Sequence, residues 1–202
     1  GGDNEERVNL ILAAAQKRFG IYGFDKTSMK EIADDLQLSK GSLYYYFPDK
    51  ENLYKAVIEH EHEDFILALK AKMTQAATPD QLLMDYNEIR LVYFKLLVNL
   101  SQVKLAKVCE LKPLLAETWT NFDSKEVSIL ASIIQKGIDQ GVFYCEDPAG
   151  VAQLFLDLLK GLRHSFVKNK ERIFIEQSEY DILKMKTTAF VEIFINGLKF
   201  KK

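Results

Sequence analysis

Residues 27–54 constrain the fold most, because they carry the start and stop signals of two short helices. Ser28 and Glu31 have the spacing of a capping box, in which each side chain bonds the backbone amide of the other residue. Ser39 is a second N-cap residue. Pro48 ends the helix that follows, since the residue before a proline avoids the helical conformation. The pattern predicts two short helices joined by a tight turn.

The second of these helices is predicted to expose side chains that suit DNA. Gln37 and Leu38 make the turn before it, and Leu43 faces the core. A lysine suits phosphate, a serine hydroxyl can bond a base edge, and a glycine lets the backbone come close. A tyrosine can bond phosphate through its hydroxyl or contact a thymine methyl. The exposed candidates are Lys40, Gly41, Ser42, Tyr44 and Tyr45. We expect this helix to enter the major groove.

The rest of the chain repeats apolar residues at helical spacing, and no run alternates as a strand would. Hydrophobic residues make up 48% of the chain and only 4 are proline, which favours an all-α protein with a sizeable core. About nine to ten helices are predicted. Besides the two short ones, they span residues 3–22, 49–76, 81–109 (one bent helix or two), 114–122, 123–140, 147–168 and 180–200. Residues 1–50 are expected to form a three-helix DNA-binding domain, and residues 51–202 a C-terminal bundle for ligand binding and dimerisation.

Composition and motifs argue against several other classes of protein. The net charge of −2 produces no global field for nucleic acid, so DNA binding depends on where the lysines face. No apolar run approaches the roughly 20 residues of a membrane span, and two cysteines suggest a reducing, cytoplasmic setting. No catalytic, phosphate-binding or zinc-binding spacing occurs, so neither enzyme activity nor a cofactor is expected. The run from His60 to Glu63 is interpreted as a solvated helix face rather than a metal site.

Residues 39–47 resemble the recognition helix of the TetR family of bacterial transcriptional regulators. The supporting positions outside this helix are Phe19, Gly20, Gly23, Thr27, Ile32, Ala33, Lys50, Glu51 and Leu53. Gln37 stands where the family often has glycine, which implies some backbone strain, and Tyr46 stands where it often has histidine. The resemblance implies contacts with operator DNA from Thr27, Ser28, Ser39, Lys40, Gly41, Ser42, Tyr44, Tyr45 and Lys50.

The same resemblance implies a homodimer and a small-molecule pocket in the C-terminal bundle. The last two long helices would form the interface, through Phe155, Leu159, Leu162, Phe190, Phe194 and Leu198. The pocket candidates are Tyr86, Tyr93, Phe94, Trp119, Phe122 and His164. For both sets the alternative is that the side chains belong to the core of a single subunit.

We expect a ligand-responsive transcriptional regulator, most often a repressor in this family, that binds a pseudo-palindromic operator as a homodimer. A small, mostly apolar effector would release it from DNA. Two alternatives stay open. One is a regulator of the same fold that answers to a protein partner. The other is a helical ligand-binding or metal-carboxylate protein that does not bind DNA.

Overall fold

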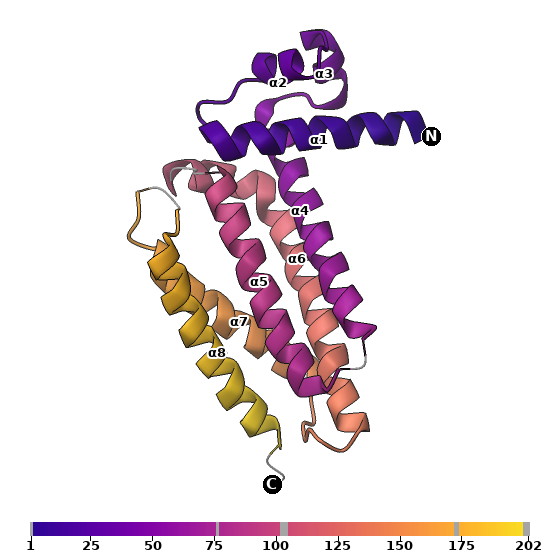
Figure 1. Ribbon diagram of the computed structural model, residues 1–202, viewed down its shortest axis with the longest axis vertical. Coiled ribbons are helices and arrows are strands. Elements are labelled where there is room, and N and C mark those ends of the chain that lie inside the picture. Colours follow the sequence, from indigo (N-terminus) through magenta and orange to yellow (C-terminus); the bar gives the residue numbers. More distant parts are fainter. Residues whose placement is uncertain (1, 76, 102–104, 172–173, 200–202) are drawn as a thin grey trace. The chain divides into compact units, whose positions relative to one another are not determined.

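The computed structural model describes residues 2–75, 77–101, 105–171 and 174–199, and all of the regular secondary structure in these ranges is helical (Figure 1). The helices are α1 (Gly2–Tyr22), α2 (Met29–Asp35), α3 (Lys40–Tyr46), α4 (Lys50–Met73), α5 (Pro79–Ser101), α6 (Leu105–Asp139), α7 (Pro148–Val167) and α8 (Gln177–Lys199). The prediction of an all-α fold is confirmed. No described helix is long and apolar enough to cross a membrane.

The chain divides into two compact units. The first comprises Gly1–Glu63, Leu96–Ala116 and Lys170–Phe174, and the second comprises Asp64–Lys95, Glu117–Asn169 and Ile175–Lys202. The predicted separation of residues 1–50 from residues 51–202 as functional domains stays a prediction.

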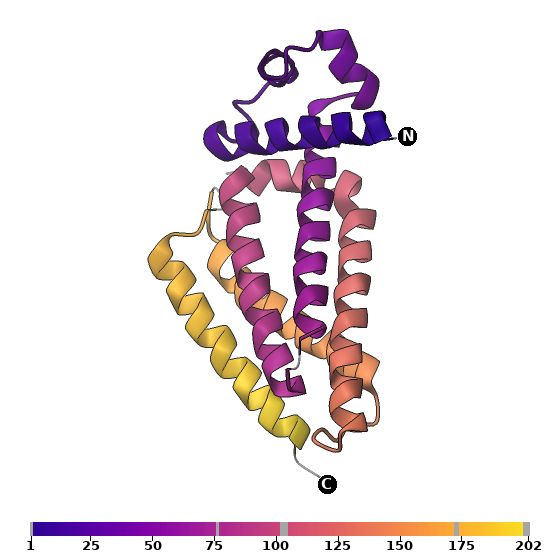
Figure 2. The ribbon, with the colours of Figure 1, turned by 45° about the vertical axis from the view of Figure 1, so that its right-hand side comes forward.

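The first unit is built on α1, which buries one stripe of apolar side chains. Ile11, Leu12, Ala15 and Phe19 are all buried, at the spacing of one helical face. α1 contacts α2, and α2 contacts α3, so the two short helices lie together on one side of the longer one (Figures 1 and 2).

Three aromatic rings tie α1, the loop after it and α4 together. The ring centroids of Phe19 and Phe24 are 5.7 Å apart, and the Tyr54 ring meets Phe24 at 5.0 Å and Phe19 at 5.5 Å. Pairs in such geometries contribute about 0.5–1.5 kcal/mol each beyond the burial of their area. This cluster therefore holds together α1, the loop after it and the start of α4, which support α2 and α3.

The predicted caps and turn are confirmed. The Ser28 hydroxyl accepts from the Glu31 amide at 3.2 Å, and the Glu31 carboxylate accepts from the Ser28 amide at 2.9 Å. Ser39 caps α3 by accepting from the Ser42 amide at 3.1 Å. In the turn between the helices, Gln37 has a φ of 55°, a left-handed conformation that a side chain makes costly.

Replacing Gln37 by glycine is expected to stabilise the protein by up to about 1 kcal/mol, because glycine adopts a positive φ without steric cost. Urea unfolding measures the change. The control is Gln135→Gly in the interior of α6, where glycine is expected to destabilise by about 0.5–1 kcal/mol. Equal losses of stability in both variants would contradict the assignment of strain to position 37.

The second unit is a bundle made from the later part of α4, α5, most of α6, α7 and α8. α5 and α6 run beside α4 in both ribbon views, and α7 crosses behind them at an angle (Figures 1 and 2). The core includes buried side chains from every one of these helices, among them Phe65, Tyr86, Leu130, Phe155 and Val191.

α6 corrects the predicted helix boundaries. The sequence predicts separate helices at 114–122 and 123–140, with an interruption at Pro113, but α6 runs through all of these residues without a break. Pro113 and Cys109 are exposed, so the carbonyl that loses its helical donor four residues back can face solvent. Asp123, the first residue of the predicted helix 123–140, lies inside α6, and its carboxylate accepts from Lys160. The described ranges therefore contain eight helices, where nine to ten were predicted.

The C-terminal end of α6 requires two glycines. Gly141 has a φ of 70°, and the Val142 amide donates back to the Gly137 carbonyl at 2.9 Å, as in a Schellman motif. The chain then folds the Phe143 ring onto Gly137, where a β-carbon would lie 2.1 Å from that ring. Because Phe143 is 1% exposed, it has little room to move away.

Gly137→Ala is expected to destabilise the protein by about 1–3 kcal/mol through overpacking, lowering the midpoint of thermal unfolding. Gly197→Ala in α8 is the control, because its added methyl group meets nothing within 4 Å. Removing that glycine is expected to stabilise by about 0.4–1 kcal/mol. A Gly137→Ala variant as stable as the parent protein would contradict the close contact.

Candidate nucleic-acid interface and effector cavity

α3 buries one side and exposes the other. Leu43 is 0% exposed and anchors the helix, whereas Tyr45 is 82% exposed and Tyr44 is 39% exposed. The Lys40 ammonium lies 5.6 Å from the centre of the Tyr44 ring, and the Tyr46 ring meets Tyr45 edge-on at 5.2 Å. The exposed face therefore joins one cation to two aromatic rings with polar tips.

The hydroxyl groups near this face are engaged in local hydrogen bonds. The Ser39 and Ser42 hydroxyl oxygens lie 2.8 Å apart and bond each other. The Ser28 hydroxyl donates to the Glu31 carboxylate at 2.9 Å. Thr27 is 2% exposed, and its hydroxyl donates to the Gly23 carbonyl at 2.8 Å. These groups shape the helix-turn-helix, and the side chain of Thr27 has almost no surface to offer DNA.

Lys50 is also held inside the first unit. Its ammonium donates to the Phe24 carbonyl at 2.8 Å and sits 4.3 Å from the centre of the Phe24 ring. Partial burial lowers the pKa of Lys50. Among the predicted DNA-contacting residues, the side chains that face solvent with unused polar groups are Lys40, Tyr44 and Tyr45.

The predicted solvated face on α4 is wrong at two positions. Glu61 is 3% exposed and His62 is 1% exposed. The Gln16 amide donates to the Glu61 carboxylate at 2.5 Å, which links α1 to α4. No cluster of three or more potential metal ligands occurs among the described residues.

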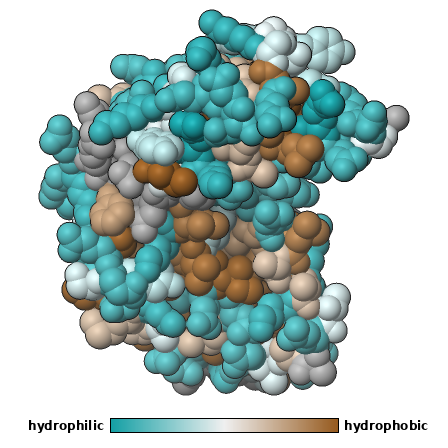
Figure 3. Space-filling model, turned by 45° about the horizontal axis from the view of Figure 1, so that its top comes forward, coloured by the Kyte–Doolittle hydropathy of each residue, from teal (hydrophilic) through white to brown (hydrophobic). Residues whose placement is uncertain are grey.

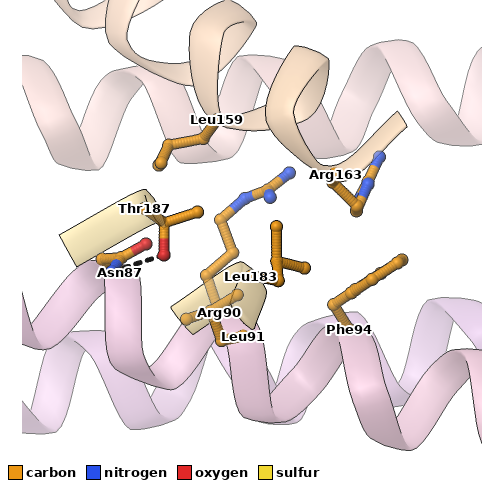
Figure 4. A pocket seen from close by; sticks show the side chains of 8 residues that line it. All are labelled: Asn87, Arg90, Leu91, Phe94, Leu159, Arg163, Leu183 and Thr187. Carbon is orange, nitrogen blue, oxygen red and sulfur yellow. Dashed lines mark hydrogen bonds between the residues drawn. The ribbon is translucent and has the colours of Figure 1, made fainter. Parts of the chain in front are cut away.

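The second unit contains a small cavity between α5, α7 and α8 (Figure 4). Its polar lining is Asn87, Arg90, Arg163 and Thr187. Its apolar lining is Leu91, Phe94, Leu159 and Leu183. The cavity volume is about 10 Å³, room for about one water molecule.

Two arginines dominate the electrostatics of this cavity. The Arg90 Nε donates to Glu126 at 3.1 Å, and the Tyr86 hydroxyl donates to the same carboxylate oxygen at 2.7 Å. Arg163 lies 4.8 Å from the centre of the Phe94 ring and forms no ion pair with the residues that the structure describes. Desolvation and the positive charge of Arg90 lower the pKa of Arg163 to about 10.

Of the predicted effector-binding residues, the cavity includes Phe94 alone. Tyr86 is a core residue, the Tyr93 ring stacks on Phe65 at 4.8 Å, and Phe122 is buried against Trp119. His164 is exposed. The sequence signal that was missed is the position of Arg90, which lies on the same helical stripe as the buried Leu83 and Tyr86.

The predicted interface residues lie mostly inside the single subunit. Phe155 is 0% exposed, Leu159 2% and Leu198 7%. These three side chains therefore lie in the core of the single subunit, which was the alternative interpretation. Phe190 and Phe194 are partly buried and pack on Phe155, and Leu162 is partly exposed. Other apolar side chains of α7 and α8 face solvent instead, namely Leu154, Leu158, Ile182, Met185 and Ile193. On the face shown in Figure 3, most of the surface is hydrophilic and apolar side chains gather near the centre.

Comparison with known proteins agrees with this geometry. Residues 11–57 match the family model described as bacterial regulatory proteins, tetR family. The crystal structure of a transcriptional regulator from Cytophaga hutchinsonii is 36% identical, with a TM-score of 0.89, over 96% of this chain and 99% of that one. The HTH-type transcriptional regulator QacR of Staphylococcus aureus is 25% identical over 190 residues, 93% of this chain and 96% of QacR.

A Bacillus subtilis protein described as an uncharacterized HTH-type transcriptional regulator, YfiR, is 24% identical over 168 residues, covering 78% of each chain. These relatives are transcriptional regulators, and the part of the chain that the family model matches contains the capped helices α2 and α3. The chain belongs to the TetR family of DNA-binding helix-turn-helix transcriptional regulators.

Proposed function

We propose that the protein is a homodimeric repressor that binds a pseudo-palindromic operator and leaves it when a small-molecule effector binds the second unit. The observation that carries the proposal is the exposed face of α3, where Lys40, Tyr44 and Tyr45 stand free on a helix anchored by Leu43. Binding at the operator excludes polymerase. Such a regulator acts where bacterial DNA lies, in the cytoplasm.

Each exposed side chain of α3 has a role in this proposal. Lys40 neutralises a backbone phosphate, which contributes affinity without sequence preference. Tyr44 and Tyr45 reach into the major groove, where a ring edge can contact a thymine methyl and a hydroxyl can bond a phosphate or base edge. Ser28, Ser39 and Ser42 position the two helices, and Gly41 permits close approach of the backbone.

The proposed dimer interface lies on the exposed apolar faces of α7 and α8. Leu154 and Leu158 are four residues apart on α7, and Ile182, Met185 and Ile193 follow one stripe of α8. Ile193 is 72% exposed and Met185 is 64% exposed in the single chain. A two-fold dimer through this face would suit a pseudo-palindromic operator whose half-sites lie about 34 Å apart, one turn of DNA.

Lys40→Ala is expected to weaken binding to the operator and to flatten its dependence on salt. Selection from random duplexes first identifies the operator as an enriched pseudo-palindrome. The slope of log affinity against log salt concentration should then fall by about 2 in the variant, close to one phosphate contact for each subunit. Lys70→Ala, an exposed lysine of α4, is the control and should keep the parent slope. An unchanged slope in Lys40→Ala would remove this lysine from the interface.

Ile193→Arg is expected to convert the dimer into a monomer, because two buried guanidinium groups would face each other across the two-fold axis. Light scattering after size-exclusion chromatography measures the mass. Leu67→Arg is the control, since Leu67 is an equally large apolar residue of α4 that is 57% exposed. A dimer that survives Ile193→Arg and dissociates with Leu67→Arg would place the interface elsewhere.

A further inference from the structure

We propose that the effector is a monocarboxylate with an apolar body, whose carboxylate binds between Arg90 and Arg163. This inference rests on the proposed response to an effector and narrows it to one chemical class. It refines the expectation of a mostly apolar ligand by adding one negative charge at a defined place in the cavity.

The charges around the cavity do not balance. Arg90 is paired with Glu126, whose same carboxylate oxygen also accepts from the neutral Tyr86 hydroxyl. Arg163 adds a second positive charge, and Lys160 nearby is already paired with Asp123. The two arginines and Glu126 therefore sum to one excess positive charge, which a single carboxylate neutralises and a doubly charged phosphate exceeds.

The two guanidinium groups have hydrogen-bond donors available for a ligand carboxylate. Arg90 donates to Glu126 through its Nε, and its guanidinium also lies close to the Tyr86 hydroxyl. The Arg163 guanidinium has no described hydrogen-bond acceptor and rests against the face of Phe94. Figure 4 shows Arg90 rising from α5 to the level of α7, close to where Arg163 projects. Guanidinium groups bind carboxylates through paired, charge-assisted hydrogen bonds, which suits these two side chains.

The remaining walls suit the rest of the ligand. Leu91, Phe94, Leu159 and Leu183 are each at most 6% exposed and provide apolar surface beside the arginines. On the polar side, the Asn87 amide donates to the Thr187 hydroxyl at 3.2 Å, so these two groups are already satisfied. Because the cavity has room for only about one water molecule, an apolar body enters only if the leucines shift. Binding thus changes the packing of α5 against α7 and α8.

The test uses the 202-residue chain and a panel of monocarboxylates with straight, branched and aromatic bodies, each paired with its uncharged amide. Thermal unfolding screens the panel, and calorimetric titration gives the affinity of the carboxylates that stabilise. At least one carboxylate is expected to raise the melting temperature, whereas its amide does not. A panel in which no carboxylate stabilises, or in which amides bind as well as carboxylates, overturns the inference.

The Arg163→Met variant tests whether the carboxylate binds at Arg163. It is expected to weaken carboxylate binding by about tenfold or more, the loss of a charge-assisted hydrogen bond, and to keep or raise the melting temperature of the ligand-free protein. Arg163→Lys, which keeps the charge but loses the paired geometry, should bind with intermediate affinity. Arg7→Met, an exposed arginine of α1, is the control. Equal carboxylate affinity in Arg163→Met and the parent protein overturns the assignment.

DNA release is measured separately with the stabilising carboxylate. If it binds through Arg163 but leaves operator binding unchanged, the anion site stands and the proposed effector response fails. If the parent protein and Arg163→Met are released from the operator alike by an uncharged compound, the effector response stands and the carboxylate inference fails.

Discussion

The packing of Phe19, Phe24 and Tyr54 is the interaction on which the DNA-binding part of the molecule depends. α2 and α3 have seven residues each, too short to be stable in isolation. They persist because Ile32, Ala33 and Leu43 are buried against α1 and its neighbours. The aromatic cluster supplies that support, and Lys50 closes it by bonding the Phe24 carbonyl. The side chain of Lys50, which the family resemblance assigns to DNA contact, thus stabilises the aromatic cluster that supports α2 and α3.

The features that sequence predicted well depend on neighbours along the chain. Ser28 with Glu31 and Ser39 with Ser42 act over three residues, so their spacing alone identifies the caps. The turn at Gln37 was equally local. The predicted helix break at Pro113 was wrong because the effect of a proline depends on its exposure, which the sequence does not show. On the surface of α6, Pro113 removes one backbone hydrogen bond and the helix continues.

The cavity was beyond such reasoning because its polar residues come from three helices. Nothing links Arg90 to Arg163 until α5 and α7 are packed together, and Glu126 joins them from α6. Aromatic residues were the natural candidates in sequence, yet Tyr86 and Phe122 were needed for the core. The buried charges cost free energy unless each is paired, which is why an incomplete set of partners indicates a function rather than a fold.

The hydrogen bond between Ser39 and Ser42 has an evolutionary consequence. This bond lies within the first turn of α3, and the buried Leu43 anchors the helix. The stability of α3 therefore depends little on the exposed side chains of Tyr44 and Tyr45. Descendants of this protein can therefore exchange the residues at positions 44 and 45 with little loss of stability. With the proposed operator contacts of Tyr44 and Tyr45, a gene duplicate could acquire new target promoters through these two codons while the rest of the first unit stays under selection.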